Sequence, residues 1–222
     1  MPRIVNHDQR RTMIAEVTAS LVAELGIERV TMREVAQRGG FSKGVLQHYF
    51  ADRAELLASA LNWSEAQCMA RIQAAAHREA VEGLAALQVR IENILPLTAP
   101  SLEEWKIRLQ VQGLAIVDSQ IRPLQKSRFQ KVRRHLLRDI QRAIDAGEIK
   151  AGLDGPQVVR DVLMLITGLG TLAVLNPGAF SRAQLRRSVK QLIESVEAVP
   201  PRASATRRHV ETGGEQVPLQ HL

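Results

Sequence analysis

The sequence predicts an all-α protein, and three observations support this fold class. No stretch alternates β-branched with polar residues, and no Asn-Gly or Asp-Gly hairpin joins two such stretches. Helix starts are marked by a capping residue that Glu or Gln follows three positions later. Glycines and one Asn-Pro-Gly segment mark helix ends. Because only 3% of the 222 residues are aromatic, Leu, Val, Ile and Ala must build the core.

The capping pattern and the apolar periodicity divide the chain into helices. The predicted starts are Thr31/Glu34, Asp52/Glu55, Ser101/Glu104, Asp154/Gln157 and Ser181/Gln184. The predicted stops are Gly26, Gly39-Gly40, Gly147 and Asn176-Pro177-Gly178. Together they predict helices at about residues 10–25, 32–38, 43–49, 53–78, 81–95, 102–117, 123–146, 156–175 and 182–199.

The second and third of these helices predict a helix-turn-helix. Each has only about seven residues, so tertiary packing must hold it in place. A glycine-containing turn joins them, and the helix at 10–25 carries a one-sided apolar stripe that can brace both. We expect Leu46 and Phe50 to face inward and Ser42 to cap the third helix. That helix would then present Lys43, Gly44 and Val45 to the major groove of DNA.

The segment VTMREVAQRGGFSKGVLQHYFADRAELLASAL resembles the N-terminal domain of TetR-family transcriptional regulators. The positions that carry the resemblance are Thr31, Ala36, Gly39, Ser42, Tyr49-Phe50, Arg53 and Leu56-Leu57. The similarity covers about residues 10–60. A looser likeness across residues 102–143 is to the BetI-like group of that family.

The resemblance implies a role for ten residues in DNA binding. Ser42 stands at the start of the reading helix, and the implied contacts to base edges are those of Arg33, Lys43, Gly44, Val45 and His48. The implied contacts to phosphates are those of Thr31, Gln47, Tyr49 and Arg53. Gln47 stands where the family often has Tyr, and Arg53 where it often has Lys; both side chains can still bind phosphate.

The rest of the chain is expected to bind an effector and to dimerise, as the resemblance implies. Residues 162–175 are apolar on all sides, which indicates a helix buried on more than one face. Gly168 and Gly170 would let another helix approach closely. The next helix carries an apolar face of Leu185, Val189, Leu192 and Val196. We expect a homodimer through about residues 156–199; the alternative is that both helices pack only within one chain.

Three residues are candidates for contacts with an unknown small-molecule effector. Trp105 and Gln112 share one face of the helix at 102–117, and Arg133 falls within the apolar stripe of the next helix. Gln112 could orient a ligand or be a satisfied polar group of the core. Arg133 could pair with an anionic effector, pair with an acidic residue, or extend its charged end to solvent.

The charge of the chain does not locate the DNA-binding surface. The formal net charge is +7 and the pI near 10.3, which favours a polyanionic partner. Residues 1–61 nevertheless carry eight basic and seven acidic residues, whereas residues 106–142 carry ten and two. Within that second segment Lys131, Arg134, Arg138 and Arg142 share one helix face. The simplest interpretation is a solvated surface.

Several other classes of protein are disfavoured. The single cysteine cannot form an internal disulfide, residues 1–11 have no apolar signal region, and the apolar run at 162–175 is shorter than the roughly 20 residues of a membrane span. The six histidines lack metal-ligand spacing, no Gly-x-Ser-x-Gly occurs, and GGFSKG is not a phosphate-binding loop. We therefore expect a cytoplasmic protein without a catalytic site, metal, cofactor or membrane partner.

These observations predict three segments and one function. Residues 1–51 form the helix-turn-helix domain, residues 52–199 a helical effector-binding and dimerisation domain, and residues 200–222 a flexible tail. The predicted function is that of a sequence-specific DNA-binding regulator, a repressor that a small molecule releases from a palindromic double-stranded operator. Two alternatives stay open: an effector-independent activator or architectural DNA-binding protein, and a helical protein that binds anionic membrane or a protein partner.

Overall fold

The all-α prediction is confirmed by a computed structural model that describes residues 7–198. Within this range the chain forms one short 3₁₀ helix, η1 (Ile27–Arg29), and nine α-helices. The α-helices are α1 (His7–Leu25), α2 (Met32–Gly39), α3 (Lys43–Tyr49), α4 (Arg53–Glu79), α5 (Gly83–Ile94), α6 (Ala99–Val117), α7 (Arg122–Asp145), α8 (Gly155–Leu175) and α9 (Arg182–Val196). Residues 200–222, predicted as a tail, lie outside the described range.

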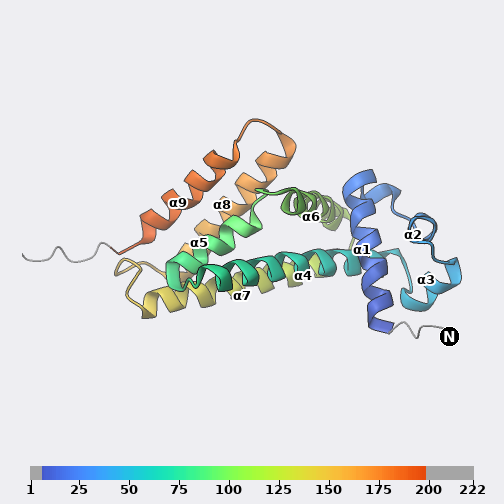
Figure 1. The fold of residues 1–222 in the computed structure, drawn as a ribbon, viewed down its shortest axis with the longest axis horizontal. Coiled ribbons are helices and arrows are strands. Elements are labelled where there is room, and N and C mark those ends of the chain that lie inside the picture. Colours follow the sequence, from blue (N-terminus) through green and yellow to red (C-terminus); the bar gives the residue numbers. More distant parts are fainter. Residues whose placement is uncertain (1–6, 199–222) are drawn as a thin grey trace, which may run out of the picture.

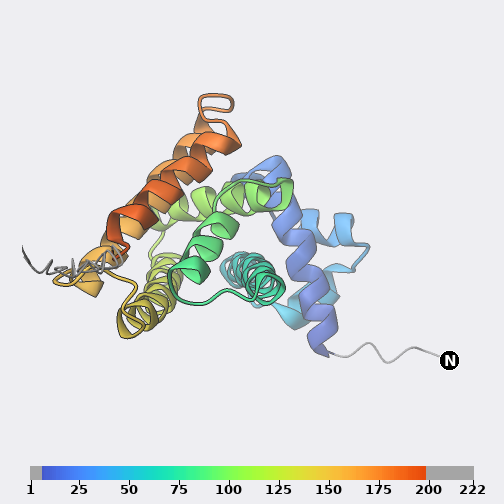
Figure 2. The ribbon, with the colours of Figure 1, turned by 60° about the vertical axis from the view of Figure 1, so that its left-hand side comes forward.

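The helix-turn-helix and the last two helices occupy opposite ends of an elongated molecule. Figure 1 shows α2 and α3 at one end and α8 and α9 at the other, with the long helix α4 running from the first end toward the second. Figure 2 shows α4 nearly along its axis, with α1 on one side and α5 on the other. We call α1, η1, α2 and α3 the head.

Two clusters of buried side chains form the core, and two helices contribute to both. The head cluster contains residues of α1 to α3 together with Leu56 of α4 and Ile107 of α6. The second cluster joins α4 through α9 and contains Ile72 of α4 and Trp105 of α6. Helices α4 and α6 are therefore the rigid connections between the head and the rest of the chain, while the division into residues 1–51 and 52–199 stays a prediction.

Four of the five predicted helix starts are confirmed by side-chain caps. Each capping oxygen accepts a hydrogen bond from the backbone N–H three residues later. The four caps are Thr31, Asp52, Asp154 and Ser181.

The fifth predicted start, at Ser101, is wrong. Helix α6 begins at Ala99, three residues before the predicted first residue at position 102, and Thr98 is its cap. The hydroxyl of Thr98 accepts from the N–H of Ser101, and the hydroxyl of Ser101 accepts from the N–H of Thr98. Glu104, the expected partner in the cap of Ser101, is bonded to Arg71 of α4 instead.

Helix α9 ends at Val196, three residues before the predicted end. The carbonyl of Val196 accepts from the N–H of Lys150, and the N–H of Ala198 donates to the carbonyl of Glu148. The chain thus leaves the helix because the loop between α7 and α8 takes over its backbone hydrogen bonds.

Helix α8 begins one residue before the predicted start at 156, and only part of its apolar surface is buried within the chain. With 21 residues, the helix is long and apolar enough to cross a membrane, judged by length and composition alone. Core helices of globular proteins also meet this criterion. Val162 and Ile166 are buried in the second cluster. Met164 and Leu175, by contrast, are 64% and 66% exposed. One side of α8 therefore packs within the chain, and another leaves an apolar face uncovered.

Candidate nucleic-acid interface and adjoining cavity

The turn between α2 and α3 depends on two glycines. Gly40 ends α2 in the left-handed conformation, with a φ of 67°. The N–H of Phe41 donates to the carbonyl of Ala36 at 2.9 Å, which folds the aromatic ring back over the helix end. A Cβ at Gly39 would lie 2.2 Å from a carbon of that ring. The predicted tight turn is therefore confirmed, and a side chain at position 39 would force the ring of Phe41 out of place.

Helix α3 is anchored on one side and open on the other. Leu46 and Phe50 are 0% and 1% exposed, as predicted. Ser42 caps the helix, and its hydroxyl accepts from the N–H of Val45 at 3.2 Å. The exposed positions of the helix are Lys43, Gly44, Gln47 and His48. A helix of seven residues is too short to be stable alone, so these anchors fix the surface that it presents.

Arg11 of α1 ties the end of α3 to the start of α4. Its guanidinium donates to the carbonyl of Tyr49 at 2.6 Å and to the carboxylate of Glu55 at 2.5 Å. The same group lies 4.5 Å from the centre of the Phe50 ring. The hydrogen bonds from Arg11 and from the N–H of Ala51 lower the pKa of Glu55, so this carboxylate stays charged in mildly acidic solution.

All ten predicted DNA contacts lie in the helix-turn-helix or at the start of α4. Seven are exposed: Thr31, Arg33, Ser42, Lys43, Gly44, Gln47 and His48. Val45, Tyr49 and Arg53 are partly buried. Their contacts with DNA stay predictions, but the structure brings them to one end of the molecule.

Arg53 differs from the other nine because its guanidinium is already bonded inside the protein. Its Nε donates to the carbonyl of Val30 at 2.8 Å, and one of its terminal nitrogens donates to the carbonyl of Ile27 at 2.5 Å. These bonds hold the start of α4 against η1 and the residue that leads into α2. The geometry favours a positioning role beside, or in place of, the predicted phosphate contact.

A cavity of about 140 Å³ is lined by residues of α4 through α8. Two of the three predicted effector contacts, Trp105 and Gln112, line it. Arg133 does not: it is exposed on α7, whose cavity-facing positions include Arg128 and Val132. The aliphatic part of the wall consists of Met69, Ile72, Ile94, Val132, Leu163 and Ile166.

Sequence reasoning missed two arginines of the cavity. Arg108 and Arg128 are only 9% and 8% exposed, and both lie in residues 106–142, the segment with the largest excess of basic residues. For Arg108 a signal was present, because it lies three residues after Trp105 and four before Gln112 and therefore on the same helix face. Lys131 and Arg134 in the same segment are exposed, as predicted.

The charged groups of the cavity wall are paired, with the exception of Arg108 and the exposed Lys131. The Nε of Arg128 lies 2.7 Å from a carboxylate oxygen of Glu65, although the angles do not satisfy a hydrogen bond, so we describe this contact as an ion pair. Arg90 is paired with Asp139. Burial is the main cause that lowers the pKa of Arg128.

Arg108 has neither a hydrogen bond nor an ion pair with any residue in the described range. Its Nε is buried without a partner, and its guanidinium lies 4.3 Å from the centre of the Trp105 ring. Burial, and then repulsion from Arg128, lower the pKa of Arg108 to about 9. The more distant carboxylates of Glu104 and Glu65 act in the opposite direction. The side chain therefore keeps its charge at neutral pH without a direct partner for it.

Cys68 also lines the cavity and is 7% exposed. Burial raises the pKa of its thiol, and the neighbouring carboxylate of Glu104 raises it further. A thiol in this state is a poor nucleophile, so Cys68 is a structural residue of the cavity wall.

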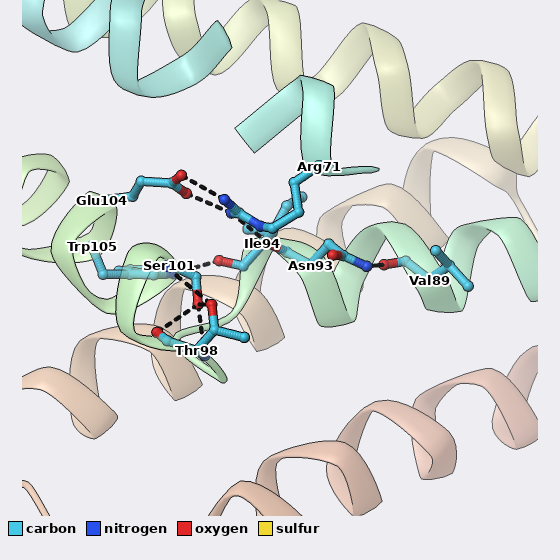
Figure 3. A network of polar contacts seen from close by, with 8 residues as sticks. All are labelled: Arg71, Val89, Asn93, Ile94, Thr98, Ser101, Glu104 and Trp105. Atoms are coloured by element: carbon cyan, nitrogen blue, oxygen red, sulfur yellow. Dashed lines mark hydrogen bonds and ion pairs between the residues drawn. The ribbon is translucent and has the colours of Figure 1, made fainter. Parts of the chain in front are cut away.

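A polar network attaches the cavity wall to α4 and α5 (Figure 3). Arg71 of α4 donates to both carboxylate oxygens of Glu104, at 2.7 and 2.6 Å, and to the carbonyl of Asn93 at 3.0 Å. The indole N–H of Trp105 donates to the carbonyl of Ile94 at 2.6 Å. A shift of Trp105 would therefore strain contacts with both neighbouring helices.

The opposite side of α6 contacts the head. Gln110 accepts a hydrogen bond from the N–H of Ile27 at 2.5 Å and donates to the carbonyl of Val22 at 3.0 Å. Ile107 and Val111 are buried in the head cluster. Helix α6 thus carries cavity residues on one face and head contacts on another, within two turns.

This fold and these two sites define a helix-turn-helix DNA-binding protein with an internal cavity, and comparisons with known proteins agree. Residues 14–60 match the family described as "Bacterial regulatory proteins, tetR family". Residues 84–197 match "BetI-type transcriptional repressor, C-terminal". The chain belongs to the TetR family of transcriptional regulators, in its BetI-type group.

Relatives cover most of the chain at low identity. HTH-type transcriptional regulator PksA of Bacillus subtilis is 25% identical over 94% of this chain and 100% of its own. HTH-type transcriptional regulator BetI of Serratia proteamaculans is 24% identical over 83% of this chain and 90% of its own.

Solved structures share the fold. A putative TetR-family regulator from Rhodococcus has a TM-score of 0.77 at 21% identity and covers 86% of this chain and 100% of its own. A putative regulator from Saccharomonospora viridis, solved in complex with choline, has a TM-score of 0.75 at 21% identity, with the same coverage.

Proposed function

We propose that the protein is a homodimeric repressor that binds a palindromic operator and leaves it when a small molecule fills the cavity. The observation that carries this proposal is the double role of α6. Trp105 and Arg108 line the cavity, while Ile107 and Gln110 contact the head. A ligand that moves α6 would therefore change the position of α3 on the DNA.

The exposed apolar face of α8 supports dimerisation through about residues 156–199. Met164, Leu172 and Leu175 are 64%, 41% and 66% exposed. Large apolar side chains gathered on one exposed face are typical of a protein interface. A two-fold dimer would present two copies of α3 to two half-sites of an operator, whereas one short helix reads too few bases.

The release mechanism sets an energetic condition on the effector. It must bind the chain more tightly in the conformation that does not fit DNA, because equal affinity for both conformations shifts nothing. Such a regulator would act on DNA in the cytoplasm, without a membrane partner.

The choline complex of the Saccharomonospora protein favours a cationic effector as a second candidate. A quaternary ammonium group would need exposed aromatic faces around it. In this chain the guanidinium of Arg108 already lies over the Trp105 ring. The wall is therefore less suited to a cation than the resemblance alone suggests.

A footprint on the DNA that flanks the protein's own gene tests the proposed function. Protection of two half-sites related by a dyad, spaced by about one helical turn, would support a dimeric operator-binding regulator. Uniform protection that disappears with salt would indicate architectural or non-specific binding instead. A metabolite panel screened by thermal shift, followed by the footprint with each stabilising compound, then separates an effector-released repressor from an effector-independent activator.

A further inference from the structure

The cavity holds one buried positive charge that the protein does not neutralise. Arg108 is 9% exposed, lies over the Trp105 ring, and has no hydrogen bond or ion pair within the described residues. The carboxylates of Glu104 and Glu65 attract it from a distance but are themselves paired with Arg71 and Arg128. A buried cation without an ion pair is unfavourable, so it points to a partner that is missing from the isolated chain. The missing partner must be negatively charged or strongly hydrogen-bond accepting.

The other titratable groups of the cavity do not change this balance. Arg128 is paired with Glu65, and Arg90 with Asp139. Burial and the nearby Arg90 lower the pKa of His135, so its ring is neutral at neutral pH. Lys131 is exposed and its charge is solvated. One uncompensated buried charge matches a ligand with one negative charge.

The rest of the wall is mainly aliphatic and the space is small, with Gln112, Gln125 and Thr167 as its uncharged polar residues. The side-chain oxygen of Gln125 is buried without a hydrogen-bond partner. Aliphatic side chains of α4, α5, α7 and α8 surround the site, including Ile72, Ile94 and Leu163. A buried cavity of roughly 150 Å³ lined by such side chains holds a molecule of about the size of benzene. The volume here, about 140 Å³, therefore suits a compact apolar body.

We propose that the effector is a small organic acid whose single carboxylate pairs with Arg108 and whose apolar body lies against the aliphatic wall. The planar guanidinium can donate two parallel hydrogen bonds to a carboxylate, which fixes the orientation of the ligand. The proposal names the ligand class for the cavity of the proposed function. Binding itself, however, can be measured without DNA.

Two series of matched probes test the charge requirement on the full-length protein. The first is octanoate, octanamide and octylamine; the second is benzoate, benzamide and benzylamine. Binding is followed by calorimetry and by protection of Cys68, the only cysteine in the chain, from alkylation at raised pH. We expect at least one acid to bind about tenfold to a hundredfold more tightly than its amide or amine, because a hydrogen bond to a charged group contributes about 1.5–3 kcal/mol.

Substitutions at Arg108 locate the charge. Arg108→Met should abolish the preference for the acid over the amide, and Arg108→Lys should retain part of it, since the charge stays but the planar fork is lost. Arg134→Met is the matched control: Arg134 is exposed on α7 outside the cavity wall, and its substitution should leave the preference unchanged. Circular dichroism of each variant verifies that it folds.

Three results would overturn the proposal. The first is that an acid binds no more tightly than its matched amide or amine. The second is that neither acid binds at millimolar concentration. The third is that Arg108→Met still prefers the acid. A failure of the proposed function looks different. If the acids bind but do not release operator DNA, or if no operator exists, the regulatory role is wrong while the ligand class stands.

Discussion

At the scale of single residues, Lys43 is the side chain best placed to read a base. It stands at the exposed first turn of α3, with no ion pair inside the described part of the chain. A lysine there can donate to the acceptor atoms of guanine in the major groove. We expect Lys43→Ala to reduce the discrimination between operator and scrambled DNA by about 1–3 kcal/mol, measured by competition binding at fixed salt.

The control for Lys43 removes the same charge from a distant surface. Arg142 is exposed near the end of α7, in the segment with the largest excess of basic residues. Arg142→Ala should retain the operator preference, because the base contacts do not depend on the total charge. If Lys43→Ala weakened both DNAs equally, Lys43 would be a phosphate contact and the assignment of base-reading positions on α3 would be wrong.

Arg53 leads to a second prediction, in which stability and salt dependence separate two roles. Its guanidinium donates to the carbonyls of Ile27 and Val30, so Arg53→Ala should lower the free energy of unfolding by about 2 kcal/mol. We expect operator binding to weaken while its salt slope stays unchanged. A slope reduced by about 0.9 would show instead that the side chain neutralises a phosphate. Arg33→Ala, at an exposed position of α2, is the control that should cost no stability.

Single residues also show how far sequence reasoning reaches. The inward side of α3 was predictable, since the spacing of Leu46 and Phe50 determines which side of a helix they share. The burial of Arg128 was not, because it depends on Glu65 of α4, 63 positions away, lying beside it. An arginine on a basic helix is exposed by default, and only the tertiary packing of α7 on α4 overrides that default.

At the scale of elements, helix starts could be predicted from the sequence where the capping hydrogen bond joins residues close together in the chain. The caps at Thr31, Asp52, Asp154 and Ser181 use an oxygen and an N–H three residues apart. The prediction at Ser101 was wrong because its expected capping partner is bonded elsewhere: Arg71 of α4, 33 positions away, takes Glu104 out of the capping pattern. The 3₁₀ helix η1 has no such local pattern, and Arg53 and Gln110 hold it from outside.

The packing of α6 against α8 depends on one glycine. A Cβ at Gly170 would lie 2.1 Å from a carbon of the Trp105 ring, which is itself bonded to Ile94. Gly170→Ala should therefore lower the free energy of unfolding by about 1–3 kcal/mol and alter ligand binding in the cavity. Chemical denaturation measures the first effect and calorimetry the second.

Gly113→Ala is the matched control on α6. Nothing lies within 4 Å of a Cβ built at Gly113, which is exposed. Replacing a helical glycine by alanine where space is open should stabilise by up to about 1 kcal/mol. Equal stabilisation by both substitutions would mean that Trp105 does not pack against Gly170 in solution.

At the scale of the whole molecule, the uncovered side of α8 predicts the assembly. Met164→Glu and Leu172→Glu each place a charge on this apolar face without entering the core of the chain. We expect sedimentation to show monomers that remain helical, with operator affinity reduced at least about a hundredfold because the two half-sites are no longer joined. Gln191→Glu is the control, since Gln191 is exposed on the polar side of α9. Variants that stay dimeric would place the interface elsewhere.

The last prediction concerns communication between the cavity and the head, which lie on opposite faces of α6. The side chain of Gln110 bonds to the end of α1 and to the start of η1, so it transmits any displacement of α6 to the head. Gln110→Ala should leave probe binding in the cavity intact but reduce its effect on operator affinity by about 0.5–2 kcal/mol. The measurement is operator affinity with and without a saturating acid probe, together with the reciprocal titration, because the coupling must be equal in both directions. Lys106→Ala, at a half-exposed ion pair with Glu103 on the same helix, should change neither quantity. Unchanged coupling in Gln110→Ala would mean that the signal reaches the head through α4 instead, where Leu56 and Ile72 belong to the two different cores.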